Sequence, residues 1–194
     1  MDASEARDHL QWIDGIVRAT DRSLHMPPVT LIAWGLFGTM VNALHQATAS
    51  GMTVPRDEVL HLPMMVVAIG VSVWAASRGR AARQSLVDSN AGIVFSVVFA
   101  VLMLVNLAAQ NTVIPFQAMA LFWCVGFSIA LLIVGIQASR PLWIGGLALL
   151  AASVTAGHIP GWFDGILALG WALGFVVPGI VLALERPDGR TASI

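Results

Sequence analysis

Six long apolar segments dominate this sequence, and each approaches the length that a helix needs to cross a lipid bilayer. A transmembrane helix takes about 20 predominantly apolar residues, because the hydrocarbon core is roughly 30 Å thick. The segments cover residues 28–47, 59–77, 91–109, 113–138, 141–157 and 163–184. Within lipid every backbone polar group needs an internal partner, so segments of this kind fold as helices. We therefore predict an all-α polytopic integral membrane protein with six transmembrane helices.

The composition agrees with this class and excludes several kinds of chemistry. Hydrophobic residues make up 57% of the 194 and charged residues only 11%, whereas a soluble domain has about 25% charged residues. The sequence contains no lysine, which excludes Schiff-base catalysis and a phosphate-binding P-loop. A five-span arrangement is the main alternative, because the fifth segment is short and the sixth contains Gly170, Gly174 and Pro178.

The arginines predict how the six segments are oriented. If all six cross the membrane, nine of the ten basic residues fall on one side and only Arg56 falls on the other. Those nine are Arg7, Arg18, Arg22, Arg78, Arg80, Arg83, Arg140, Arg186 and Arg190. Cytoplasmic loops carry the excess of basic residues in membrane proteins. We expect both termini in the cytoplasm, and the bias toward Arg, Ala, Gly and Val suggests a bacterial inner membrane.

Three parts of the chain are expected. Residues 1–26 form an amphipathic helix, since Ala6, Leu10, Ile13 and Val17 recur at helical spacing and the charged residues lie mostly elsewhere. Pro27 and Pro28 break this helix before the transmembrane domain, residues 27–185, and residues 186–194 form a short cytoplasmic tail. The amphipathic helix either lies on the membrane surface, which we favour, or docks on a protein. Its acidic residues are wrong for a cleavable leader, so we expect none.

The middle of the apolar segments carries no Asp, Glu, Arg or His. Ionisable residues inside a membrane usually mark proton relays or paths for charged substrates. The sequence also has no GxSxG, HExxH or paired aspartates for intramembrane proteolysis. We therefore expect neither a pump nor an enzyme, and no binding of nucleic acid.

Glycines indicate where helices approach each other closely. Gly170 and Gly174 repeat at a spacing of four within the sixth segment, which is typical of a helix-packing face. The spacing does not tell whether that face packs within the chain or against another copy. Gly157, Gly161 and Gly165 share the spacing, but Pro160 lies among them and indicates a turn.

Three histidines are expected at the outer ends of the helices. His45 ends the first segment, His61 begins the second and His158 ends the fifth, with Asp164 nearby. Imidazole and carboxylate suit zinc or copper, and two histidines on neighbouring helices could ligate haem iron. The hypothesis is a metal site of His45, His61 and His158 with Asp164 as an orienting partner. The alternative is that these histidines cap helices or meet lipid headgroups.

Three functional hypotheses follow. The first is a non-enzymatic subunit or small regulatory partner of a larger membrane assembly, in contact with the bilayer and with a membrane-protein partner or a second copy. The second is an outer-face metal- or haem-binding protein for electron transfer or metal handling. The third is a facilitator for an uncharged or lipid-like molecule, which would need no buried charge.

Overall fold

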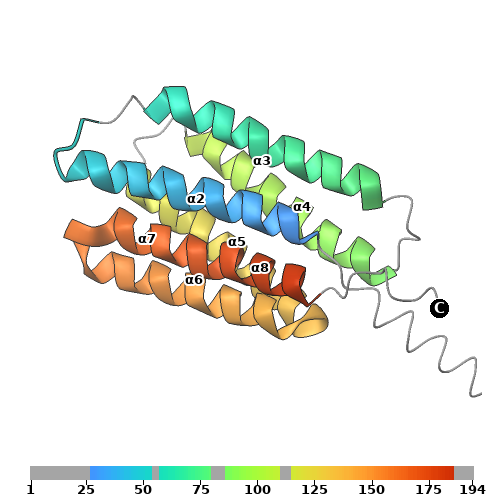
Figure 1. Ribbon diagram of the computed structural model, residues 1–194. Coiled ribbons are helices and arrows are strands. Elements are labelled where there is room, and N and C mark those ends of the chain that lie inside the picture. The colour runs from blue at the N-terminus through green and yellow to red at the C-terminus, as the bar shows by residue number, and fades with distance from the viewer. Residues whose placement is uncertain (1–26, 54–56, 80–85, 110–114, 186–194) are drawn as a thin grey trace, which may run out of the picture.

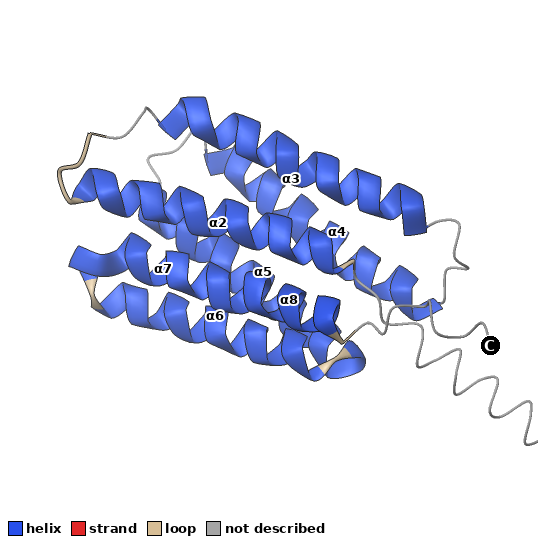
Figure 2. Cartoon of the chain, in the orientation of Figure 1, coloured by secondary structure: helices blue, strands red, loops and turns tan. Residues whose placement is uncertain are grey.

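Six long helical segments make up the computed structural model, which describes residues 27–53, 57–79, 86–109 and 115–185. All regular structure within these residues is helical (Figure 2). The elements are α2 (Pro28–Ala49), α3 (Asp57–Gly79), α4 (Leu86–Ala109), α5 (Phe116–Ala138), α6 (Arg140–His158), a short turn of 3-10 helix (Pro160–Trp162), α7 (Phe163–Trp171), a π-helical turn (Ala172–Val176) and α8 (Val177–Leu184). The all-α fold and the count of six long helices are therefore confirmed, with α7, the π turn and α8 forming the sixth.

The helices match the apolar segments, and α2, α3, α4 and α6 extend past them. The clearest case is α4, which begins at Leu86, although its apolar segment begins only at residue 91. Backbone hydrogen bonds in a helix are local, so the helix continues through polar residues that a hydropathy limit leaves out. The predicted amphipathic helix and the predicted tail lie outside the described residues.

Neighbouring helices run in alternating directions, and α2 occupies the centre of the bundle (Figure 1). It packs between α3 on one side and the α7–α8 segment on the other. The α6 helix packs against both α7 and α5, and α4 packs against α5. The start of α2 lies beside α8, where a Cβ on Gly179 would come within 3.0 Å of the Pro28 carbonyl oxygen. The first and last described helix ends therefore lie at the same end of the bundle.

A cluster of aromatic rings fills the space between these helices, and Phe127 of α5 is at its centre. Five ring centroids lie 5.5–6.5 Å from that of Phe127. They belong to Trp34, Phe95, Trp123, Trp171 and Phe175. Edge-to-face and tilted pairs at these distances stabilise a core beyond the area they bury. The rings come from α2, α4, α5 and the sixth segment, so one cluster joins four of the six helices.

Glycines on α2 make room for two of these rings. A Cβ on Gly35 would lie 2.7 Å from Phe175 Cβ, and one on Gly38 would overlap the Trp171 ring. Both distances are far inside van der Waals contact, so α2 can lie against the sixth segment only because these positions have no side chain.

Gly170 and Gly174 pack within the chain, against α6. A Cβ on Gly170 would lie 2.6 Å from Ala152 Cβ, and one on Gly174 would lie 3.0 Å from Leu149 Cβ. The predicted helix contact is therefore confirmed. It joins the sixth segment to the fifth and leaves these glycines unavailable to another copy.

The π-helical turn Ala172–Val176 lies just before Pro178. Proline has no amide hydrogen, so Pro178 cannot donate to the Gly174 carbonyl four residues earlier. Such gaps in the hydrogen-bond ladder commonly accompany π turns and kinks. The Gly174 carbonyl instead faces α6, where a Cβ on Gly145 would come within 2.5 Å of its oxygen.

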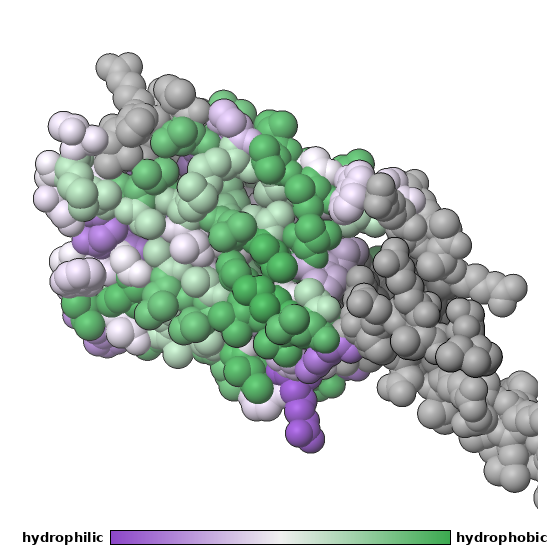
Figure 3. Space-filling view, in the orientation of Figure 1, coloured by the Kyte–Doolittle hydropathy of each residue, from purple (hydrophilic) through white to green (hydrophobic). Residues whose placement is uncertain are grey.

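Three helices are long and apolar enough to cross a membrane within the described part of the chain. They are Gln117–Gln137, Arg140–His158 and Pro160–Leu184, and shorter apolar stretches cover Leu60–Ala75 and Ile93–Ala108. Apolar side chains cover the middle of the molecule in Figure 3, while paler residues gather at the end where α2 finishes and α7 begins. This distribution fits a membrane protein.

Replacing both Gly170 and Gly174 with leucine should destabilise the protein. Four extra carbons at each position would push the sixth segment off α6, and overpacking of this kind costs about 1–3 kcal/mol per site. Thermal unfolding of detergent-solubilised protein, followed by circular dichroism, should show a lower midpoint. Gly157→Leu is the matched control, because a Cβ there meets nothing within 4 Å. Equal midpoints for the double variant and the wild type would contradict the contact.

Candidate functional site

The end of the bundle where α2 finishes and α7 begins gathers the polar residues that the sequence singled out. Gln46, in the last turn of α2, links these elements. Its Nε2 donates to the Gly161 carbonyl at 3.1 Å, and its Oε1 accepts from the Gly165 amide at 3.0 Å. One side chain thereby holds both the turn after α6 and the first turn of α7. We call this pair of hydrogen bonds the Gln46 clamp.

The clamp fixes the height along the bundle axis at which His45 and Asp164 lie, because these residues are next to Gln46 and Gly165 in sequence. His45 precedes Gln46 and is half-buried, and Asp164 precedes Gly165 and is only 9% exposed. Asp164 lies in the first turn of α7. The positive end of a helix dipole stabilises a carboxylate there, which offsets part of the cost of burying it. His45 and Asp164 therefore share one level of the bundle, as the topology predicted.

The other two histidines lie at the same end but make separate contacts. His61, near the start of α3, packs edge-on against Phe37 of α2 with ring centroids 5.3 Å apart. His158, the last residue of α6, is exposed, and its Nδ1 lies 2.9 Å from the Val154 carbonyl oxygen. A carbonyl only accepts, so Nδ1 carries the hydrogen and donates. This bond ties the His158 ring to the last turn of its own helix.

Metal-site geometry gives no direct support for the metal hypothesis. Across residues 27–53, 57–79, 86–109 and 115–185, no three His, Cys, Asp or Glu side chains gather as a metal centre requires. The three histidines share an end of the bundle, but they do not form a group of three ligands within those residues. Metal or haem binding by His45, His61 and His158 stays a prediction.

Asn42 is the most deeply buried amide of this region. It is 6% exposed and lies one turn before Gln46 on α2. Its Nδ2 donates to the Gly38 carbonyl at 2.8 Å, so the side chain bonds to its own helix. Its Oδ1 is buried and accepts no hydrogen bond within the described structure.

The clamp is the feature that sequence reasoning missed. A single glutamine at the end of an apolar segment has no spacing that distinguishes it from a solvent-facing residue. Its partners are backbone groups more than a hundred residues away in sequence, and only the fold brings them within reach.

Comparison with protein-family models, with curated proteins and with solved structures finds no match for this chain. The fold itself defines the class, which is an all-helical protein with helices able to span a membrane. Its function is therefore inferred from its own geometry.

Metal analysis of protein purified without an affinity tag or chelator tests the histidine hypothesis. If His45, His61 and His158 bind one ion, the wild type should hold one equivalent and each single His→Ala variant much less. Asp164→Asn should have a smaller effect, as expected for a residue that only orients a ligand. Sub-stoichiometric metal in the wild type would exclude the site and leave three helix-end histidines.

Proposed function

We propose that this protein is a six-span bacterial inner-membrane protein with both termini in the cytoplasm, and that it acts as a non-enzymatic subunit or small regulatory partner of a larger membrane assembly. The observation that carries this proposal is the unequal packing of the helices. The α3 and α4 helices each pack mainly against one neighbour, α2 and α5 respectively. Each of the other long helices packs against two or more neighbouring helices.

The side chains of α3 and α4 reflect this position. Among their described side chains, only Ala68 and Ala75 of α3 and Leu102 of α4 are buried. The α6 helix, in contrast, buries Leu142, Gly145, Gly146, Leu149, Ser153 and Ala156 along its length. Gly70 of α3 has open space where a Cβ would stand, so another helix could approach α3 there. The proposal is that a partner helix or a second copy packs on this face.

The interior supports a role without transport or catalysis. Phe127 and the rings around it occupy the middle of the bundle, and the hydroxyls of two buried serines bond locally. Ser128 donates to the Cys124 carbonyl and Ser153 to the Leu149 carbonyl, each at about one turn's distance. Trp34 Nε1 donates to Ser72 Oγ at 3.0 Å and ties α2 to α3. A facilitator would need these contacts to open, which is why we rank that hypothesis lower.

The orientation rests on the arginine asymmetry together with the position of the helix ends. The start of α2 and the end of α8 lie at one end of the bundle, and the end of α3, the start of α4 and the α5–α6 turn lie at that same end (Figure 1). In the sequence, arginines flank all of these ends, as positive-inside topology requires. The α2 helix carries polar residues such as Thr39, Asn42 and Gln46, and we propose that it spans the membrane because its neighbours shield it.

Alkaline phosphatase fusions test the topology. The enzyme is active only outside the cytoplasm, so fusions after Gly51 or Asn111 should be active and fusions after Asp88 or Ser139 inactive. Activity after Ser139 would reverse the orientation of α5 and α6 and would sink the six-span arrangement.

Site-specific photocrosslinking in membranes tests the partner role. A photoreactive residue at Val66 of α3 or Val97 of α4, which are 59% and 55% exposed, should give discrete protein adducts. Leu173 and Ile180 of the sixth segment are the matched controls, since they are 43% and 45% exposed but lie on a helix already packed on two sides. Lipid adducts alone at all four positions would contradict the proposed interface.

A further inference from the structure

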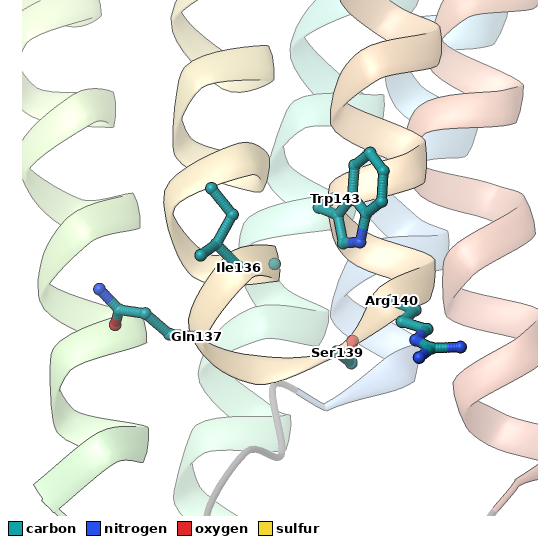
Figure 4. Close-up of a pocket in the computed structure, with 6 residues that line it drawn as sticks. Ile136, Gln137, Ser139, Arg140 and Trp143 are labelled. Carbon is teal, nitrogen blue, oxygen red and sulfur yellow. The ribbon is translucent and has the colours of Figure 1, made fainter.

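An open hollow of about 420 Å³ lies on the surface at the turn between α5 and α6. Its lining residues are Gly135, Ile136, Gln137, Ser139, Arg140 and Trp143 (Figure 4). It lies at the end of the bundle opposite the Gln46 clamp.

The polar part of this hollow carries the positive charge of Arg140, and one of its hydroxyl groups, that of Ser139, lacks a hydrogen-bond partner. The α6 helix begins at Arg140 and has no acidic residue in its first turn. Ser139 occupies the capping position but makes no side-chain hydrogen bond to the helix, and its Oγ is buried without a partner. Pro141 lacks the amide hydrogen that a capping serine could otherwise accept. The Arg140 guanidinium and the first turn of α6 therefore lie together at one part of the hollow, which suits an anion.

The remaining part of the hollow is apolar. Ile136 is 79% exposed on α5, and Trp143 is 37% exposed on α6. Figure 4 shows both side chains alongside the helices, with Ser139 and Arg140 at the turn below them. Gly135 lets the two helices touch here, because a Cβ there would lie 2.6 Å from Trp143 Cα. The hollow thus changes from charged to apolar along the helix direction, as a lipid does from headgroup to acyl chain.

We propose that this hollow binds an anionic phospholipid, with the phosphate at Arg140 and the first turn of α6 and an acyl chain along Ile136 and Trp143. Arginine binds phosphate oxygens through paired N–H groups, which favours it over a plain point charge. The apolar wall distinguishes a lipid phosphate from free phosphate, since a soluble anion would leave Ile136 and Trp143 uncovered. This inference rests on the membrane-embedded part of the proposed function and not on the partner role.

Native mass spectrometry of the delipidated full-length protein in detergent tests this site. With phosphatidylglycerol titrated in, the wild type should bind one lipid more tightly than it binds phosphatidylcholine. Arg140→Gln should weaken that binding by about tenfold, the size of a lost charged hydrogen bond. Arg78→Gln is the matched control. It removes the same charge from the last turn of α3, at the same end of the bundle, and should leave the binding unchanged.

Three results would overturn the site: unchanged lipid binding by Arg140→Gln, an equal loss in Arg78→Gln, or displacement of the lipid by millimolar inorganic phosphate. Circular dichroism of each variant checks that the helices are intact. Flotation with liposomes separates the two levels of the argument. Failure to float contradicts membrane embedding itself, whereas floating protein without Arg140-dependent binding contradicts only the lipid site.

Discussion

Ring packing around Phe127 is the contact on which the rest of the bundle depends. Lipid tails are as apolar as the helices, so the hydrophobic effect does not hold helices together inside a bilayer and close packing has to do so. Phe127 contacts rings from α2, α4 and the sixth segment, as well as Trp123 of its own helix. Gly35 and Gly38 let α2 approach these rings, and the Gly145–Gly174 approach holds α6 against the same segment. The end of the bundle that carries the clamp is positioned by this packing.

Much of the fold could be predicted from the sequence because apolar length and helix formation are coupled in a membrane. All six helices appear where the apolar segments are. Gly170 and Gly174 were correctly identified as a helix contact. Gly35 and Gly38 were missed, because their importance lies in the rings opposite them and no spacing within α2 indicates those rings.

The candidate site was less predictable. Chain topology places His45, His61, His158 and Asp164 at one end, and the structure agrees. Whether side chains converge depends on how each helix is rotated about its axis, which a one-dimensional pattern does not contain. His158 bonds to its own helix and His61 packs on Phe37. The metal hypothesis requires the histidines to converge on one ion, and these two contacts do not show such convergence. At the opposite end, Arg140 served in the sequence only to orient the segments, although it lines the described hollow.

The central claim is that side chains of the described helices pack closely around Phe127 in the core, and the reactivity of Cys124 tests it most directly. Cys124 is the chain's one cysteine, is 1% exposed, and lies beside Trp171 and Ser153 in the core. In intact membranes, small water-soluble thiol reagents applied to either side should leave it unmodified. Cysteine introduced at exposed Gly51 should react, and unfolding in detergent should expose Cys124 fully. Rapid modification of Cys124 in folded protein would reveal a water-filled path and contradict the account.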